Sequence, residues 1–415
     1  MMRDLGDGLI LRCAKESDVE RLIEHAKAVF EPTEVPFLHR LITFHPGFRY
    51  SDSFVVADKS SNRIVSFLCL IRSICVLQGV ELQVGQMHMV GTLADHRHRG
   101  LIRALNAAFE DRVTEYDLDL LVIAGIPYFY RTFGYEYAIP LGGGLAMPAE
   151  AIPALKKGEK EPVHIERVTE QTFPVYLECR QKRNSYLDLY RRVNAEEYQY
   201  YSAGKLGEEC ALEHHLVEQA NRPVGSFNLT VAWGNLEIRE LWLEDVNHLP
   251  SVLRFAKTAA QKRQLPLHVE PPSRDTLVPY LERISGSTFT KPYCWYTRIP
   301  SIKKFLETIT PALEARIANS EFRGLTDTVR LSCYREGFTI AFRDGGISEI
   351  KAVPRQELKD MHVAVPPLVV NQLLLGYRSF PELAQIYPDV LANALKVPIV
   401  TVLFPKLRTN LSPEA

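Results

Sequence analysis

A cluster of cationic residues separates an apolar stretch from a helical pattern near residue 100. Residues 86–93 (Gln-Met-His-Met-Val-Gly-Thr-Leu) predict a buried strand, and a polar run that ends in Gly100 follows them. Large apolar residues then recur at helical spacing, so a helix is predicted to begin at Gly100. The first N–H groups of a helix have no carbonyl partner and lie at the positive end of its dipole. Together with Arg97, Arg99 and Arg103, they predict a site for a phosphate group.

A second strand and an aromatic turn follow this predicted helix. Residues 118–126 (Leu-Asp-Leu-Leu-Val-Ile-Ala-Gly-Ile) predict a buried strand, and residues 127–135 read Pro-Tyr-Phe-Tyr-Arg-Thr-Phe-Gly-Tyr. A cationic loop by itself is usually a solvated turn in which a glycine such as Gly100 reverses the chain. The order of strand, cationic loop, helix, strand and aromatic turn is more specific, and it favours the phosphate site.

At these residues the chain resembles the GCN5-related N-acetyltransferase (GNAT) superfamily. In that family the acetyl-CoA loop reads Arg or Gln, two residues, Gly, one residue, then Gly or Ala, and the next strand is followed by the pattern FYxxxGF. Residues 97–102 (Arg-His-Arg-Gly-Leu-Ile) match the loop except at the last position. Ile102 there resembles the Eis-like (enhanced intracellular survival) branch, in which two large aliphatic residues follow the glycine.

The resemblance implies an acetyl-CoA-dependent N-acetyltransferase in which a neutral amine attacks the thioester directly. Tyr130, at the tyrosine of FYxxxGF, would be the general acid that protonates the departing thiolate. No metal is expected. Contacts with acetyl-CoA are implied for the loop and for the ends of the two strands: Val90, Gly91, Thr92, Arg97, His98, Arg99, Gly100, Leu101, Ile102, Arg103, Gly125 and Ile126.

Three groups are candidates for the general base. In Eis-like enzymes the terminal carboxylate of the chain lies in the site of the first domain, which implies the carboxylate of Ala415 here. This tail ends in a small residue where the family commonly has an aromatic one, so Glu414 and His88 remain alternatives. His88 alternates with two methionines on the predicted strand, and a histidine on an apolar strand is usually structural.

The elements that would position these residues fit a GNAT domain over residues 1–158. A capping box at residues 17–20 (Ser-Asp-Val-Glu) begins a predicted helix. A charged linker, residues 156–162, marks the end of this domain. Gly142-Gly143-Gly144 predicts a bulged strand rather than a second phosphate loop, because neither a helix nor a P-loop lysine follows it. Strands that precede the cationic loop are predicted at residues 9–14, 54–57, 64–71 and 74–84, with a turn at Gln78-Gly79.

Two further domains are predicted. The predicted fold class is α+β, with a mixed-sheet GNAT fold, a degenerate GNAT-like domain and a sterol-carrier-like α/β domain. Residues 159–300 contain strands and a helix in GNAT order without the cationic glycine loop, and they resemble the degenerate middle domain of Eis-like chains. Residues 301–415 resemble the sterol-carrier-like domain that closes those chains. Helices are predicted at residues 186–201, 249–261, 302–318 and 380–395, and strands at 213–217, 224–233, 236–243, 328–333, 338–343 and 347–352.

Composition excludes several classes of partner. The chain has 415 residues, of which 46% are hydrophobic and 24% charged, with a formal net charge of -1. This balance gives no electrostatic reason to expect nucleic acid or an anionic membrane as partner. No targeting signal is visible, so a cytoplasmic protein is expected. The seven cysteines are scattered without a CxxC pair and predict reduced core residues.

Three functional classes compete. Arg97, Gly100 and Tyr130 are all present, which favours an N-acetyltransferase. An inactive acyl-CoA-binding scaffold, or a carrier of hydrophobic ligands that works through the sterol-carrier-like domain, would not need all three. The acceptor stays open among aminoglycosides, polyamines and protein lysines. The resemblance also implies a homo-oligomer, a hexamer.

Overall fold

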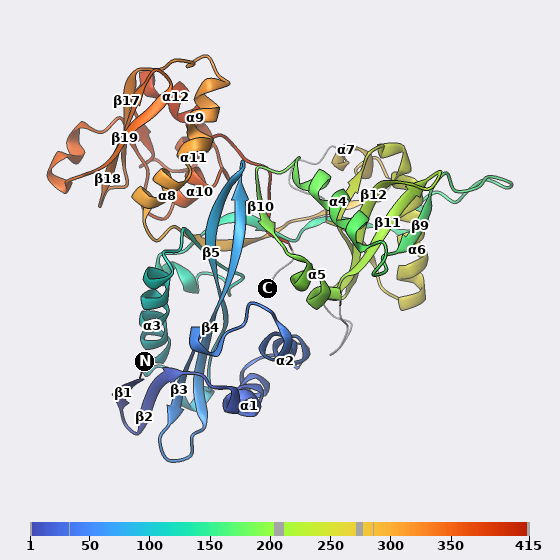
Figure 1. Ribbon diagram of the computed structural model, residues 1–415, viewed down its shortest axis with the longest axis horizontal. Coiled ribbons are helices and arrows are strands. Elements are labelled where there is room, and N and C mark those ends of the chain that lie inside the picture. Colours follow the sequence, from blue (N-terminus) through green and yellow to red (C-terminus); the bar gives the residue numbers. More distant parts are fainter. Residues whose placement is uncertain (1, 33, 203–210, 271–276, 285, 413–415) are drawn as a thin grey trace.

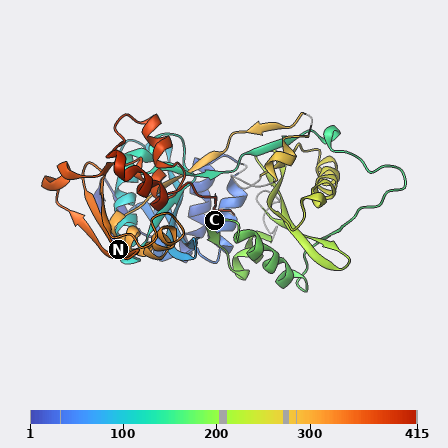
Figure 2. The ribbon, with the colours of Figure 1, turned by 90° about the horizontal axis from the view of Figure 1, so that it is seen from above.

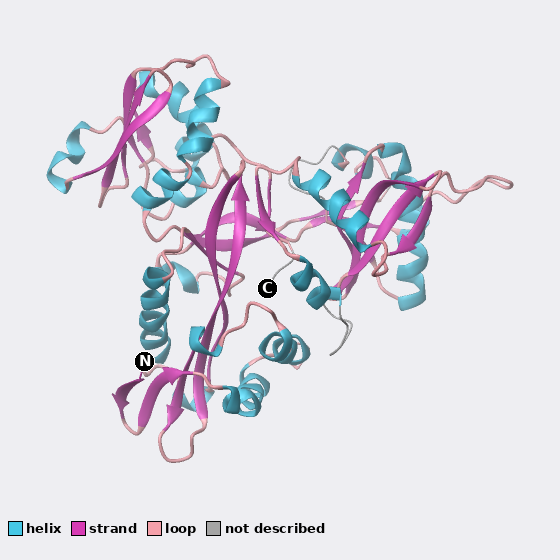
Figure 3. Cartoon of the chain, viewed as in Figure 1, coloured by secondary structure: helices cyan, strands magenta, loops and turns pink. Residues whose placement is uncertain are grey.

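The computed structural model describes residues 2–32, 34–202, 211–270, 277–284 and 286–412. It has three lobes, each built on one β-sheet with helices packed against it (Figures 1 and 3). The sheets contain both parallel and antiparallel pairs, which confirms the predicted α+β class. Among the described residues, no helix combines the length and the apolarity that crossing a membrane requires.

The first lobe is a ten-stranded sheet in the order β1-β2-β3-β4-β5-β6-β16-β7, with β10 pairing β4 and β22 pairing β10. Its strands are β1 (Met2–Gly6), β2 (Leu9–Cys13), β3 (Ser53–Asp58), β4 (Ile64–Leu77), β5 (Val80–Thr92), β6 (Leu120–Ile123), β7 (Glu136–Leu141), β10 (Leu189–Arg192), β16 (Tyr293–Arg298) and β22 (Thr409–Asn410). The predicted strands at 64–71 and 74–84 are thus two long strands, β4 and β5, joined by a hairpin at Gln78-Gly79.

Side chains alternate between the two faces of this sheet. Phe54 and Leu68 pack with helix α3 (Leu101–Glu115) on one face. Val55 and Phe67 pack on the other face with α1 (Val19–Val29) and α2 (Val35–Phe44). The sheet is therefore enclosed between two layers of helix, and the cationic loop lies at the start of one of them.

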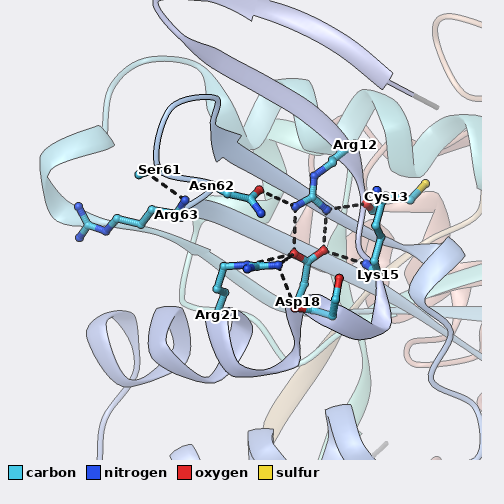
Figure 4. Close-up of polar contacts among 9 residues, drawn as sticks. Arg12, Cys13, Lys15, Asp18, Arg21, Ser61, Asn62 and Arg63 are labelled. Carbon is cyan, nitrogen blue, oxygen red and sulfur yellow. Dashed lines mark hydrogen bonds and ion pairs between the residues drawn. The ribbon is translucent and has the colours of Figure 1, made fainter.

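A buried ion-pair network fixes the start of α1 (Figure 4). The carboxylate of Asp18 accepts bonds from the Arg12 guanidinium at 2.6 and 3.0 Å, from the Arg21 Nη2 at 2.7 Å and from the Lys15 backbone N–H at 2.9 Å. Burial by itself would raise the pKa of Asp18, but these donors outweigh it and lower the pKa to about 2. Helix α1 begins one residue later, at Val19, with Asp18 as its N-cap, so the predicted capping box at residues 17–20 was wrong in position because the Asp18 side chain turns back to Lys15 and Arg12.

The second lobe is a seven-stranded sheet in the order β15-β8-β14-β13-β12-β11-β9. Its strands are β8 (Gly144–Met147), β9 (His164–Arg167), β11 (Glu213–Gln219), β12 (Arg222–Ala232), β13 (Asn235–Leu243), β14 (Leu267–Val269) and β15 (Thr288–Thr290). Its helices are α4 (Phe173–Asn184), α5 (Ala195–Ser202), α6 (Leu249–Arg263) and α7 (Val278–Leu281).

The third lobe is a five-stranded sheet in the order β19-β18-β17-β20-β21. Its strands are β17 (Asp327–Ser332), β18 (Gly337–Arg343), β19 (Gly346–Val353), β20 (Val363–Ala364) and β21 (Leu391–Ala392). Its helices are α8 (Ile302–Thr308), α9 (Thr310–Ala318), α10 (Val370–Leu374), α11 (Phe380–Ile386) and α12 (Val397–Leu403).

The first two lobes exchange strands. The segment that forms β7 in the first sheet continues as β8 in the second, and the segment that forms β15 in the second sheet continues as β16 in the first. Viewed from above, these two segments run between the lobes (Figure 2). The triple glycine lies at the β7–β8 crossing, where Gly143 has φ 82° and a Cβ would lie 2.6 Å from Pro292. The domain boundaries at residues 158 and 300 stay a prediction. β8, which precedes residue 158, pairs with β14 and β15 of the second lobe, and β16, which precedes residue 300, pairs with β6 and β7 of the first lobe.

Three predicted helices differ from the structure. Residues 186–201 contain strand β10 before α5, because residues 189–192 pair with β4 of the first sheet. The predicted helix at 302–318 is interrupted between α8 and α9, where Pro311 occupies the first turn of α9. The one at 380–395 ends at Ile386, since Pro388 excludes the helical conformation at Tyr387, which is extended (φ -117°, ψ 112°).

Candidate active site

The predicted site residues meet where two parallel strands separate. β5 pairs with β6 only from Val84 with Leu120 to Gln86 with Val122, yet β5 continues to Thr92. The carboxyl ends of parallel strands lie at the same edge of a sheet. Val90, Gly91 and Thr92 therefore line one side of the opening, and the residues that follow β6 line the other.

A β-bulge turns β5 at this opening. Phe67 pairs with Gly91 and Cys69 with His88, so Met89 and Val90 together oppose the single residue Leu68. Met89 has φ 56°, in the left-handed region that a methionine rarely adopts. On its other edge the end of β5 is held to β4, where Ser66 Oγ donates to the Gly91 carbonyl at 3.0 Å. On the opposite edge, no strand of the described residues pairs with β5 beyond Gln86.

The cationic loop begins the helix on this same edge. Gly100 is the N-cap of α3 with φ 74°, no side chain of the described residues caps this helix end, and a Cβ at Gly100 would meet nothing within 4 Å. Arg97 Nε donates to the Thr92 carbonyl at 3.4 Å, which ties the loop to the end of β5. Arg99 pairs with the exposed Asp7 at 3.1 Å. His98 and Arg103 are exposed, and Leu101 and Ile102 pack into the core beneath. Unpaired amides, positive charge and open space coincide here, which suits a phosphate group.

Tyr130 follows β6 in the short helix η4 (Phe129–Phe133) and is buried. Its ring lies directly on Gly125: a Cβ at Gly125 would be 2.1 Å from Tyr130 Cε2. Burial, with a smaller contribution from Tyr296, raises the pKa of the Tyr130 phenol. The hydroxyl therefore stays protonated at neutral pH, as a proton donor must. Ile126, by contrast, is 65% exposed at the mouth of the opening.

Sequence reasoning missed two tyrosines of this site. Tyr293 Oη donates to the Gly125 carbonyl at 2.6 Å, and the Tyr128 N–H donates to Tyr296 Oη at 2.6 Å. Both tyrosines belong to β16, which the sequence analysis placed in the middle domain. The aromatic run Tyr-Cys-Trp-Tyr at 293–296 was the only signal, and it does not reveal a partner strand.

Of the three candidates for the general base, only His88 lies among the described residues. His88 lies next to the bulge, where its Nδ1 accepts from the Met89 N–H at 3.0 Å and its ring is 5.8 Å from that of Phe37. Ala415 and Glu414 lie outside the described residues. The described chain ends at Ser412, whose carbonyl accepts from Arg180 Nη2 at 3.3 Å.

The middle lobe repeats the geometry of the opening with different chemistry. β13 and β14 pair in parallel only from Leu236 to Ile238, and β13 has a bulge at Glu240, whose φ is 53°. The Glu240 carboxylate accepts from Arg180 at 2.5 Å and from Asn228 at 2.7 Å, so a buried ion pair occupies this place. Helix α6 follows a loop with two acidic residues and no glycine, and it has Pro250 in its first turn.

Comparisons with known proteins agree with this geometry. Residues 11–138 match the family model described as an acetyltransferase (GNAT) domain. A search of curated proteins found no significant match. A structure from Enterococcus faecalis V583, a conserved protein of unknown function described as "Probable N-Acyltransferase", has 16% identity and a TM-score of 0.73, covering 98% of this chain and 100% of that one.

Two further solved structures share the fold over nearly the whole chain. A GCN5-related N-acetyltransferase from Anabaena variabilis ATCC 29413 has 16% identity and a TM-score of 0.67, with 98% of each chain covered. Eis1 from Mycobacterium abscessus has 10% identity and a TM-score of 0.61, covering 98% of this chain and 100% of that one. At these identities the likeness concerns the fold alone, and the family match, to an acetyltransferase (GNAT) domain, concerns residues 11–138.

Proposed function

We propose that this chain is an acetyl-CoA-dependent N-acetyltransferase that works at the opening between β5 and β6. The observation that carries the proposal is the meeting, at one sheet edge, of the uncapped start of α3, the bulged end of β5 and the buried Tyr130. The pyrophosphate of acetyl-CoA would bind the amides and cations around Gly100. Its thioester would lie along β5 beyond Gln86, where the pairing of β5 with β6 ends and the β6-facing edge of β5 is accessible to the carbonyl oxygen.

Tyr130 is the proposed general acid in this reaction. A neutral amine attacks the thioester carbonyl carbon, the C–S bond breaks, and the Tyr130 hydroxyl donates its proton to the departing sulfur. The raised pKa of the Tyr130 phenol keeps that proton available at neutral pH. The amine loses one proton to the general base, which balances the step.

The course of the C-terminal tail supports the carboxylate of Ala415 as the base. β22 runs parallel to β10, and β10 pairs with β4 from Leu77 to Ile74. The tail therefore advances along β4 toward Cys69, the partner of His88 beside the bulge. Leu411 is buried, and the Ser412 carbonyl accepts from Arg180, which also pairs with Glu240 of the middle lobe. Three residues remain beyond this point, and His88 and Glu414 are the alternative bases.

The finer family assignment is part of the proposal. Resemblance in sequence, together with a shared fold, supports an Eis-like chain with a degenerate GNAT-like middle domain at 159–300 and a sterol-carrier-like domain at 301–415. The Glu240 ion pair and the acidic, glycine-free loop before α6 support a middle domain that does not bind acetyl-CoA. A homo-oligomer follows from the same resemblance.

The test combines binding with turnover. Calorimetry is expected to find one acetyl-CoA per chain, and Gly100→Trp should abolish binding because a bulky residue at φ 74° both strains the loop and covers its amides. Tyr130→Phe should leave binding unchanged and lower the rate of CoA release by about a hundredfold with a panel of amines. Two binding sites per chain, or wild-type turnover in Tyr130→Phe, would contradict the proposal.

The same experiment separates the alternative functions. An inactive scaffold would bind acetyl-CoA at Gly100 but release no CoA with aminoglycosides, polyamines or lysine peptides. A hydrophobic-ligand carrier would show neither activity, and its ligand would bind a protein that carries Gly100→Trp as well as it binds the wild type.

A further inference from the structure

Two hydrogen bonds from β16 hold the turn that carries Tyr130. Tyr293 Oη and Tyr296 Oη bond the Gly125 carbonyl and the Tyr128 N–H, each at 2.6 Å. Residues three apart on a regular strand face opposite sides of the sheet. The register between β16 and β7 shifts between Trp295 and Tyr296, where Ala138 of β7 is the extra residue. Both hydroxyl groups nevertheless reach the same turn.

The turn needs such support. Tyr128 has φ 70° and ψ -33°, a conformation that costs a residue other than glycine about 1–3 kcal/mol. Its own side chain is 71% exposed, so burial of that ring does not stabilise the conformation. The bond from its N–H to Tyr296 contributes on the order of 1 kcal/mol. Stacking of the Tyr296 ring on Tyr137, with centroids 3.9 Å apart, fixes the hydroxyl that accepts this bond.

The position of Tyr130 depends on this turn. Its ring is confined between Gly125 and Tyr296, whose ring centroid is 5.6 Å away. A shift of the turn therefore moves the Tyr130 hydroxyl, and an error of about 1 Å in a catalytic group costs up to about a hundredfold in rate.

We infer that Tyr293 and Tyr296 are positioning residues for acyl transfer, which act by holding the turn at residues 125–128 so that the Tyr130 hydroxyl points at the leaving sulfur. This inference rests on the proposed function. It means that β16, which follows the middle lobe in sequence, contributes to the reaction in the first lobe.

The test replaces Tyr296 by Phe, which keeps the ring and its stacking but removes the acceptor of the Tyr128 N–H. kcat is expected to fall about tenfold, while the KM for acetyl-CoA changes less than about twofold. Tyr135→Phe is the matched control, because the Tyr135 hydroxyl is buried near Tyr130 without a hydrogen-bond partner among the described residues. That variant should keep kcat within about twofold of the wild type.

A double-mutant cycle shows whether Tyr296 acts through Tyr130. In a Tyr130→Phe background, Tyr296→Phe should have no further effect on kcat. If Tyr296→Phe lowered kcat equally in the wild-type and Tyr130→Phe backgrounds, or did not lower it in the wild-type background, the positioning role would be overturned. The role of Tyr130 as general acid would not be affected. Wild-type turnover in Tyr130→Phe would instead overturn the role of Tyr130 itself, and the positioning role with it.

A spectroscopic measurement tests the same inference without activity. With 3-fluorotyrosine at position 130, one sharp ¹⁹F line is expected in the wild type and in Tyr135→Phe. Exchange broadening or several lines are expected in Tyr296→Phe, because the turn then has more than one conformation. One sharp line in all three proteins would overturn the inference, even if no acceptor amine had been found.

Discussion

A single added methyl group at Gly125 should displace Tyr130. The Cβ of Gly125→Ala would lie 2.1, 2.3 and 3.0 Å from three ring carbons of Tyr130, where ordinary contacts begin near 3.5 Å. The backbone at Gly125 is not in the left-handed region, so the whole effect is steric. The ring cannot simply rotate away, because Phe129 and Tyr296 lie against it with centroids 5.1 and 5.6 Å away.

The magnitude follows from this overlap of more than 1 Å. Overpacking in a filled core costs about 1–3 kcal/mol, so the thermal midpoint of the Gly125→Ala variant should fall by several degrees. A displacement of about 1 Å should lower kcat by up to about a hundredfold. Acetyl-CoA binding, which depends mainly on the loop at Gly100, should change much less. Steady-state CoA release, calorimetry and a thermal melt measure the three quantities.

A control and a rescue make this test specific. Gly346→Ala adds the same methyl group where the nearest atoms are 3.6 Å away, and it should leave the melt and kcat unchanged. In a Tyr130→Ala background the overlap disappears, so Gly125→Ala should then cost no further stability. Unchanged kcat and midpoint in Gly125→Ala alone would refute the packing on which the site is built.

Three further predictions follow from the fold. The pKa of Asp18 is about 2 in the folded protein instead of 3.8, which corresponds to about 2.4 kcal/mol of stability. This contribution is fully present above pH 3.8 and is lost as the pH falls through 2. Asp18→Asn should therefore lower the denaturation midpoint at pH 7 but differ little from the wild type at pH 2. A fragment of residues 1–158 lacks β16 and should show neither a cooperative melt nor the dispersed NMR spectrum of a folded domain, unless a synthetic peptide of residues 293–298 restores them. Deleting residues 412–415 should reduce turnover at unchanged acetyl-CoA affinity, and full turnover in that variant would exclude the tail as base and leave His88 to be tested.

Local sequence patterns predicted the local structure well. The strand and helix around Gly100, the presence of helix α1 and the meander β17 to β19 follow from periodicity and turn chemistry, which act over a few residues. Most errors in the predicted secondary structure arose where contacts between distant parts of the chain determine whether a segment forms a helix or a strand. Residues 189–192 carry several polar side chains, yet they form a strand because the edge of β4 is available to them.

In the candidate site, too, the features that depend on local sequence could be predicted and those that depend on tertiary contacts could not. The loop around Gly100 and the tyrosine after β6 could be predicted from their motifs. The bulge at Met89 could not, because it depends on pairing with Leu68, and no residue type at positions 88–90 signals a positive φ. The tyrosines of β16 could not be predicted either, since nothing local indicates that a strand will insert between β6 and β7.

The exchange of strands also affects how this protein is made. During synthesis the ribosome completes β6 and β7 long before β16 exists, and the bond from Tyr128 to Tyr296 spans 168 positions of chain. Until the later segment emerges, the first sheet has a gap flanked by two unpaired strand edges, which are templates for association with other chains. Closing so long a loop also slows folding. The nascent chain is therefore expected to depend on chaperones at this stage, and pulse-labelled translation intermediates that end before residue 293 should be more sensitive to proteases than the released protein.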